Sequence, residues 1–266
     1  MTNKQHIQKY ELLEKQKKFN EEVNPIDWND CYPVTKDFDY VPKSPWKKIC
    51  NAIKRGFFIS PYAKKITKGE RKTIVKGKEN LKGIKSAIIT CNHVYIYDCL
   101  VLKHSLKPHK LKYCVAEFNN RKGFLGDMMR AEGILPLSKQ FEVLKNFSNA
   151  VEHYLLYDNY VVFYPEQSMW YMYDKPRPLK NGAFHYATKF DVPIIPTFIT
   201  FRNSGKFDKE GLEIKYFTLH ILQPIYPKKN LTKKQNIEYL KNKNYEMWKN
   251  VYEQTYEKKL KYASEK

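Results

Sequence analysis

The sequence predicts an α/β fold, in which a mixed but mostly parallel central sheet is flanked by helices and preceded by a helical N-terminal extension. Three observations predict it. The chain has 266 residues, of which 42% are hydrophobic, enough for one large domain with a substantial core. Aromatic residues make up 15% of the chain, which argues against disorder. From about residue 72 onward, short apolar runs alternate with stretches of helical periodicity, as in strands joined by helices.

The N-terminal region precedes this alternation and has two parts. Residues 1–23 are charged, with Ile7, Tyr10 and Leu13 at loosely helical spacing, and they predict a surface helix. Residues 24–45 contain four prolines and four aspartates, a composition typical of an extended arm rather than of regular structure.

Residues 46–58 predict an amphipathic basic helix. Its apolar residues recur at intervals of three and four, and they are Trp46, Ile49, Cys50, Ile53 and Phe57. Its basic residues occupy the other side, and they are Lys47, Lys48, Lys54 and Arg55. Such a helix either lies in a membrane interface or packs on the core with its lysines in water, and the pattern leaves both readings open.

The alternating region predicts a series of strands and helices. The strands are expected at residues 73–75, 86–91, 111–117, 134–137, 160–164, 192–201 and 212–225. The helices are expected at residues 98–104, 124–132, 139–157, 181–190 and 233–262. We therefore divide the chain into an N-terminal region at 1–65, an α/β domain at 66–228 and a basic C-terminal helix at 229–266.

Several classes of protein are excluded by the sequence. The longest apolar candidate for a membrane span, residues 192–201, has about half the required length and contains two prolines. The first ten residues lack the apolar core of a signal peptide, so we expect a cytoplasmic protein. The five cysteines show no Cys-x-x-Cys spacing, so we expect free thiols and no metal site.

The strong positive charge predicts an anionic partner. The chain has 48 Lys+Arg against 28 Asp+Glu, a formal charge of +20. Only six of the basic residues are arginine, the residue that sites for bidentate phosphate or base-edge contacts prefer. The charge therefore indicates a lipid surface or nucleic acid, unless it reflects only a lysine-rich composition.

One pair of His and Asp residues has the context of a catalytic site. The apolar run at 86–91 leads directly into Asn92 and His93, and Asp98 follows at the start of the next helix. On a continuous helix, residues five apart point about 140° apart, so the two side chains meet only if His93 lies on the turn. Asp98 could then accept a hydrogen bond from one ring nitrogen and leave the other as a base.

A carboxylate is expected at the same edge of the sheet as His93. The apolar run at 160–164 ends in Pro165 and Glu166, and functional groups of parallel sheets gather at the carboxyl ends of strands. Taken by itself, Glu166 could equally cap a turn.

Four ordered blocks of residues resemble the phospholipid/glycerol acyltransferase family, whose best-known activity is the acylation of lysophosphatidic acid. The blocks are Asn92-His93-x4-Asp98, Gly133-Ile-Leu-Pro-Leu-Ser-Lys139, Phe163-Tyr-Pro-Glu166 and Val192-Pro-Ile-Ile-Pro-Thr197. The resemblance covers about residues 70–225. It implies a fold like that of the glycerol-phosphate acyltransferases.

The resemblance also implies roles for the matching residues. His93 would be the general base, and Asp98 would orient it. Gly133 and Lys139 would line the region of the acceptor phosphate, and Glu166 would help to bind the acceptor. The other residues expected at the substrate are Asn92, Pro165, Gln167, Ser168, Arg177 and Lys180.

The sequence departs from the family where the family binds phosphate. After Pro-Glu the family usually continues Gly-Thr-Arg, whereas this chain has Gln167-Ser168-Met169. The second block ends in Lys139 where the family usually has arginine, and a lysine lacks the guanidinium fork. Arg177 could compensate for the missing arginine. The acceptor therefore need not be lysophosphatidic acid.

The expected function is transfer of a fatty acyl group from a thioester, acyl-CoA or acyl carrier protein, to a hydroxyl of a lysophospholipid or glycerol-phosphate-like acceptor. No cofactor is expected beyond this co-substrate. The expected partners are a membrane lipid acceptor, an anionic membrane surface and acyl carrier protein, without nucleic acid, at the inner face of the cell membrane.

Four alternatives stay open. A nucleic-acid-binding protein would suit the charge, and a relative that has lost catalysis would keep the fold. An acyltransferase-like membrane protein could act on an acceptor other than lysophosphatidate. In a covalent route, Cys91, two residues before His93, would form an acyl-enzyme.

Overall fold

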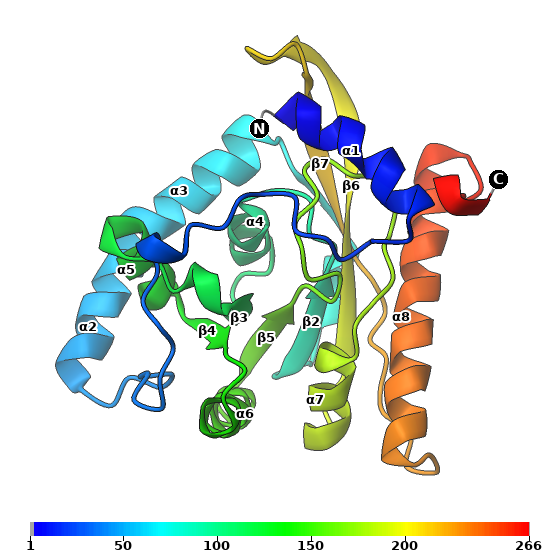
Figure 1. Ribbon diagram of the computed structural model, residues 1–266. Helices are drawn as coiled ribbons and strands as arrows, with labels where there is room; N and C mark the ends of the chain where they lie inside the picture. Colours follow the sequence, from blue (N-terminus) through cyan, green and yellow to red (C-terminus); the bar gives the residue numbers. More distant parts are fainter. Residues whose placement is uncertain (1–2, 266) are drawn as a thin grey trace.

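A seven-stranded sheet forms the centre of the protein, in a computed structural model that describes residues 3–265 (Figure 1). The strand order is β1-β7-β6-β2-β5-β3-β4. The strands are β1 (Ile74–Lys76), β2 (Ala87–Cys91), β3 (Lys110–Ala116), β4 (Ile134–Leu137), β5 (Asn159–Phe163), β6 (Ile194–Phe207) and β7 (Glu213–Ile221). The predicted α/β fold is confirmed.

The central strands are parallel and fully buried. β2 pairs with β5 and β6 in parallel register, and β3 pairs with β4 and β5 in the same sense, while β6 and β7 form an antiparallel hairpin. Every residue of β2 and β5 is buried, because helices cover both faces of a parallel sheet. This burial explains why both strands appear in the sequence as continuous apolar runs rather than as alternating patterns.

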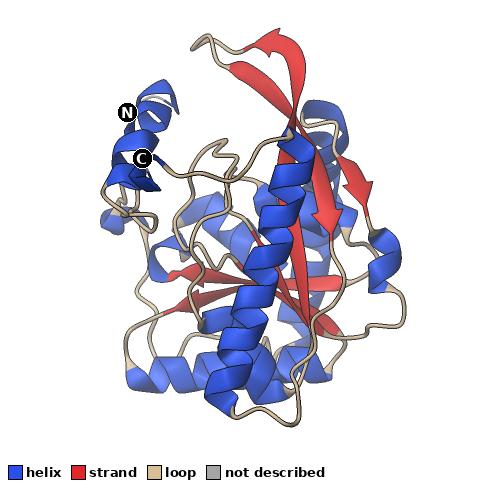
Figure 2. Cartoon of the chain, turned by 90° about the vertical axis from the view of Figure 1, so that its right-hand side faces the viewer, coloured by secondary structure: helices blue, strands red, loops and turns tan. Residues whose placement is uncertain are grey.

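Helices form a layer on each face of the sheet (Figures 1 and 2). One core cluster joins the sheet to α6 (Phe141–Leu156), α7 (Gly182–Phe190) and part of α8 (Lys233–Tyr256). The other joins it to α4 (Asp98–Ser105) and to the helical turns before β1. The remaining α-helices are α1 (Asn3–Lys15), α2 (Pro45–Lys54), α3 (Ser60–Lys64) and α5 (Gly123–Glu132).

The predicted amphipathic helix belongs to a longer helical rod. α2 is followed without a gap by η2 (Arg55–Ile59), α3 and η3 (Lys65–Glu70), in which η2 and η3 are wider π-helical turns. Figure 1 shows this rod along one side of the molecule. Its second half packs on the core through Ile59, Ala63 and Ile66, whereas α2 buries none of its residues.

The N-terminal segment crosses the carboxyl-end side of the sheet as a strap (Figure 1). α1 is a surface helix, as predicted, but its inner face is buried: Tyr10 and Leu13 pack with Trp170 and Tyr173. Residues 24–44 follow an extended path with one short helical turn, η1 (Trp28–Asp30), as their composition predicted. The prediction of helix for residues 16–23 is wrong, because α1 ends at Lys15 and these residues turn away toward the loop after β5. We call residues 10–24 the N-terminal strap.

The observed elements differ from the predicted ones mainly at their ends. α8 stops at Tyr256 rather than at residue 262, because Glu257 adopts a left-handed conformation with φ of 52° that ends the helix. β7 stops at Ile221, and beyond it Ile225 forms only an isolated bridge to Ile194. The chain division at residues 65 and 228 stays a prediction.

Two searches of residues 3–265 gave negative results. No helix among these residues has the length and apolar character needed to cross a membrane. The same residues contain no group of three or more His, Cys, Asp or Glu side chains placed to hold a metal ion.

Candidate active site

His93 and Asp98 meet at the carboxyl end of β2. The strand ends at Cys91, a short turn carries His93, and Asp98 is the first residue of α4. Nδ1 of His93 lies 3.0 Å from Oδ2 of Asp98, and the side chains are 25% and 1% exposed. Because the carboxylate accepts at Nδ1, the other ring nitrogen of His93 is left to act as a base on a substrate. The predicted pairing is present.

Asp98 also fixes the turn that carries His93. Its Oδ2 accepts backbone N–H bonds from Val94 at 2.9 Å and from Tyr95 at 3.1 Å. Burial raises the pKa of the Asp98 carboxyl, although the hydrogen bonds from His93 and the two backbone groups oppose the rise. The ring of Tyr164, the residue after β5, stacks on the imidazole of His93 with centroids 4.3 Å apart.

Glu166 binds the backbone of His93 and is not exposed at the surface of the site. It is 1% exposed, and its Oε2 accepts the His93 N–H at 3.1 Å. Its Oε1 accepts the backbone N–H of Arg177 at 2.7 Å. Both carboxylate oxygens are therefore engaged within the protein, and this geometry gives no support to a direct contact with the acceptor.

Arg177 is buried with Glu166. Its side chain is 1% exposed, and its Nη2 lies 2.9 Å from Oε2 of Glu166. The guanidinium also donates to the hydroxyl and the carbonyl of Ser168 and lies over the Trp170 ring. The expectation that Arg177 replaces the missing phosphate-binding arginine is not met, because both terminal nitrogens of Arg177 already donate hydrogen bonds to acceptors within the protein.

The N-terminal strap joins this buried pair. The carbonyl of Phe19 accepts a 3.0 Å bond from Arg177, and the amide of Asn20 donates to the Glu166 carbonyl at 3.0 Å. The carbonyl of Glu21 accepts the Trp170 indole N–H at 3.0 Å. Residues of the N-terminal strap thus support the loop after β5, which lies about 150 positions later in the chain.

A family model described as Acyltransferase matches residues 72–200, a span that contains β2, the His93 turn, Asp98 and the Glu166 loop. Over this span the chain belongs to the acyltransferase family. Membership confirms the resemblance predicted from the four blocks and makes acyl transfer the class of chemistry expected of this site.

Among solved structures, the acyltransferase resembles the crystal structure of PlsC from Thermotoga maritima, a 1-acyl-sn-glycerophosphate (LPA) acyltransferase. The TM-score is 0.57 and the sequence identity 15%, over 80% of this chain and 85% of that chain. The likeness shows that the two proteins share a fold. A search of curated proteins gave no match to the chain.

Other predicted site residues of the acyltransferase have structural partners. Asn92 is fully buried, and its amide both donates to and accepts from the backbone of Ile199, which continues the pairing of β2 with β6. Pro165 accepts the backbone N–H of Lys180 at 2.9 Å. Of the remaining predicted residues, Lys180 and Gln167 are exposed, and Ser168 is buried with Arg177.

The second block is not brought to His93. Gly133 ends α5 with φ of 100° and precedes β4, so it lies at the amino end of the strand, against the Lys112 side chain. Lys139 is exposed beyond the carboxyl end of β4. β4 is the third strand from β2 in the sheet order, about 14 Å away at roughly 4.8 Å per strand.

Cys91 is an unsuitable nucleophile. Its side chain is fully buried beneath the turn, and burial raises the pKa of its thiol well above the usual value. A protonated, enclosed thiol neither attacks nor reaches a thioester.

An exposed apolar surface lies on the first half of the rod and on α5. We call it the apolar face, and its members on α2, η2 and α5 are Trp46, Ile49, Ile53, Phe57, Phe58, Phe124 and Leu125. Each of these side chains is more than half exposed. The rod reaches the catalytic turn through Tyr62, whose ring contacts Tyr97 at 5.5 Å. The apolar side chains in the first half of the rod do not pack on the core, which speaks against the core-packing reading there, and the membrane reading stays a prediction.

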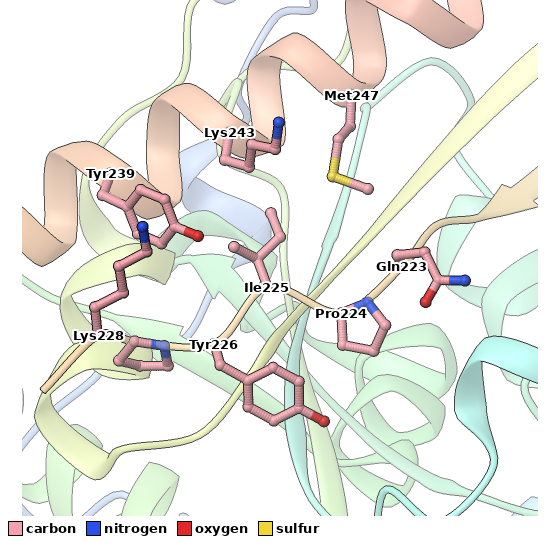
Figure 3. Close-up of a pocket in the computed structure, with 9 residues that line it drawn as sticks. Gln223, Pro224, Ile225, Tyr226, Lys228, Tyr239, Lys243 and Met247 are labelled. Atoms are coloured by element: carbon pink, nitrogen blue, oxygen red, sulfur yellow. The ribbon is translucent and has the colours of Figure 1, made fainter.

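A surface hollow of about 400 Å³ lies elsewhere, between α8 and the segment after β7 (Figure 3). Tyr239, Lys243 and Met247 of α8 face Pro224 and Ile225 across it. None of the predicted site residues lines this hollow.

Sequence reasoning missed the residues that support the site from outside its blocks. Tyr164 was expected only as a strand residue, and nothing in the N-terminal strap marked Asn20 as a partner of the loop after β5. A buried aromatic cluster of strap and loop residues is recognisable only after folding. The one sequence signal was the density of aromatic residues in 170–173, shortly after the third block.

Proposed function

We propose that this acyltransferase moves a fatty acyl group from an acyl thioester to a hydroxyl of a glycerolipid-like acceptor, with His93 as general base. The supporting observation is the 3.0 Å contact of His93 Nδ1 with Asp98, at the carboxyl end of a central parallel strand. The imidazole is partly exposed while its carboxylate partner is buried, as a base that must meet a substrate requires.

The proposed reaction uses His93 twice. The free ring nitrogen removes the proton of the acceptor hydroxyl as the oxygen attacks the thioester carbonyl, and Asp98 stabilises the imidazolium that forms. The tetrahedral intermediate then collapses, the carbon–sulfur bond breaks, and the imidazolium returns its proton to the leaving thiolate. The products are an ester and a free thiol, with the imidazole neutral again.

Glu166 and Arg177 serve this reaction as positioning residues. Glu166 accepts the backbone N–H of His93. The backbone carbonyl of His93 accepts from the Arg177 guanidinium at 3.4 Å and from the backbone N–H of Trp170 at 3.0 Å. The backbone of the base is thus held from both sides. Such preorganisation matters because a misplacement of about 1 Å can cost a hundredfold in rate.

The acceptor is proposed by its chemistry rather than by name. Arg177 is buried, and the position after Pro-Glu holds Gln167, Ser168 and Met169, so the third block presents no guanidinium to a phosphate. Exposed Lys180, whose backbone N–H binds the Pro165 carbonyl, supplies a point charge, which attracts an anionic headgroup without the bidentate fork, whereas Lys139 lies beyond β4 and away from His93. Lysophospholipids with different headgroups are therefore all candidates, with acyl-CoA or acyl carrier protein as the donor.

We place the reaction at a membrane surface. The apolar face would insert into the interface, and Lys47 and Lys48 of the same helix are exposed for contact with anionic lipid headgroups. In the catalytic turn itself, Ile96 is 61% exposed. A lipid acceptor could thus reach His93 without leaving the membrane. The expected location, peripheral on the inner face of the cell membrane, belongs to this proposal.

A purified-enzyme assay tests the proposed function. Each thioester donor is paired with a panel of lysophospholipids, and ester formation is followed by mass spectrometry. The wild type is expected to form product with at least one pair, His93→Ala to lose about a thousandfold or more in kcat, and Cys91→Ala to keep most activity.

The two variants have opposite diagnostic value. Acyl transfer by His93→Ala at the wild-type rate would contradict the general-base assignment. Loss of activity in Cys91→Ala, with His93→Ala still active, would support the covalent route instead.

A further inference from the structure

Two complementary polar atoms beside His93 are buried without hydrogen-bond partners. Asp98 makes all its hydrogen bonds through Oδ2, and among residues 3–265 its Oδ1 has no partner. The hydroxyl of Tyr164 is likewise buried and has no partner among these residues. One atom accepts hydrogen bonds and the other can donate one, and a buried polar group without a partner costs free energy.

Both groups adjoin the same imidazole. The Tyr164 ring stacks on His93 at an interplanar angle of 25°, and the Asp98 carboxylate binds its Nδ1. The charge of Asp98 helps to raise the pKa of Tyr164, although burial is the larger cause. The phenol therefore keeps its proton at any pH at which the enzyme works, and it stays a donor.

The other groups around the phenol keep a constant charge. Burial raises the pKa of Cys91 on β2 and of Tyr113 on β3 well above their usual values, and that of Cys99 on α4 to about 12, so all three are neutral. Glu166 and Arg177, on the loop beyond the His93 backbone, neutralise each other in their ion pair. His93 is therefore the group whose charge changes during turnover, beside an Asp98 carboxylate that must stay ionised to support it.

We propose that Tyr164 is a positioning residue that donates its phenolic hydrogen to Oδ1 of Asp98 in the working enzyme, directly or through one water molecule. The inference rests on the proposed role of His93 as base. The proposed hydrogen bond adds a third residue to the pair of His93 and Asp98. The ring of Tyr164 supports the imidazole, and its hydroxyl supports the carboxylate.

This link would keep Asp98 ionised. A hydrogen bond donated to a carboxylate stabilises the charged form and lowers its pKa, which opposes the effect of burial. Loss of the donor raises the pKa of Asp98, so the carboxyl takes up a proton at a higher pH and no longer supports the imidazolium. The acid side of the pH profile should therefore move toward neutral pH.

Tyr164→Phe tests the link, because it removes the hydroxyl and keeps the stacked ring. We expect the acid limb of kcat/KM to move up by about one pH unit and kcat at neutral pH to fall about three- to tenfold, with KM for the acceptor unchanged. Difference infrared spectroscopy of the carboxyl band, assigned with Asp98→Asn, should show the same upward shift for Asp98. This second readout needs no substrate, so it stays decisive if the acceptor proposal fails.

Tyr113→Phe is the matched control. The Tyr113 hydroxyl is also buried and donates to the carbonyl of Cys99 at 2.9 Å, next to Asp98 in the chain. Its loss should reduce stability without moving the pH profile. If Tyr164→Phe and Tyr113→Phe leave the acid limb and the Asp98 band equally unmoved, the link is wrong and Tyr164 serves only as a packing surface.

Discussion

The polar residues of the loop after β5 serve the fold of the active site more than its surface. Glu166, Ser168 and Arg177 are each at most 3% exposed, and they bind one another and the backbone of His93. Removal of one partner from a buried charge pair of this kind is strongly destabilising, because the other charge is left buried without compensation. At the scale of single residues, the protein therefore places charge inside the molecule to fix a backbone and leaves His93 to meet the substrate.

Lys112 is a charged residue that makes folding less favourable at neutral pH. It lies on β3 under the ring of Tyr154, and burial together with the charge of Arg55 lowers its pKa to about 8. A lysine whose pKa is lower in the folded state than in the unfolded chain makes folding less favourable while it is charged. Its cost is present below about pH 8 and disappears as the pH rises toward 10.5.

We therefore expect Lys112→Met to stabilise the protein by about 1–2 kcal/mol at pH 7, after allowance for its partial exposure and the lost contact with Tyr154. Urea unfolding at pH 7 and pH 10 measures the difference, which should shrink at the higher pH. Lys110→Met, at an exposed position on the same face of the strand, is the control and should change little. An equal gain at both pH values would show that packing, not charge, is responsible.

At the scale of elements, the N-terminal strap and the loop after β5 act as one unit. The strap is held by Glu14, which binds the Tyr173 hydroxyl at 2.6 Å and Lys175 at 2.9 Å. Phe19 and Asn20 then bind Arg177 and the Glu166 backbone. The position of the base therefore depends on a segment about 75 residues earlier in the chain.

A double-mutant cycle on Glu166 and Arg177 tests this coupling. We expect Glu166→Gln and Arg177→Met each to cost about 3–5 kcal/mol of stability, because each leaves a buried charge unpaired. The double variant should cost clearly less than the sum, while its kcat stays about a hundredfold low because the His93 turn is no longer held.

The exposed pair of Lys243 and Glu246 on α8 provides the control cycle, with an expected coupling below about 0.5 kcal/mol. Additive stability losses at Glu166 and Arg177, or a double variant with wild-type kcat, would contradict the positioning role.

At the scale of the whole molecule, the two halves of the rod of residues 45–70 differ in exposure. Its second half packs on the core, and its first half presents the apolar face outward. Arg55 of this rod is engaged internally, with a 2.7 Å bond to the Ala131 carbonyl, whereas Lys47 and Lys48 are exposed. The formal charge of +20 thus combines internal cations with a surface population able to contact lipid.

Vesicle binding tests this orientation. Trp46→Ser combined with Phe57→Ser should weaken binding to vesicles that contain anionic lipid at least tenfold, because two large side chains no longer enter the interface. Lys47→Glu combined with Lys48→Glu should weaken binding at low salt and have little effect at high salt, where charges are screened. Tyr226→Ser, at a position 57% exposed after β7, is the control.

An oligonucleotide gel shift belongs in the same experiment. Tight binding of nucleic acid at physiological salt, with no preference for vesicles, would favour the nucleic-acid alternative and count against the membrane proposal. Unchanged vesicle binding by the Trp46 and Phe57 double variant would show that another surface carries the contact.

Sequence reasoning was most successful where local patterns dictate structure. The apolar runs predicted β2 and β5, the ordered blocks predicted the family, and the strand-to-turn context of His93 predicted its contact with Asp98. It was least successful for residues whose role depends on a distant partner. Gly133 was expected at the acceptor, yet the edge position of β4 keeps it away from His93, and neighbours within a sheet are not encoded by order along the chain.

By itself, then, the sequence determined the α/β class, the acyltransferase family and the dyad of His93 and Asp98, because short-range periodicity and spacing carry that information. Only the tertiary structure decided that Arg177 is sequestered by Glu166, that the N-terminal strap supports the catalytic turn, and that the first half of the rod is exposed. These three features depend on which surfaces come into contact when the chain folds. Burial then decides whether a charge or an aromatic ring faces protein or solvent.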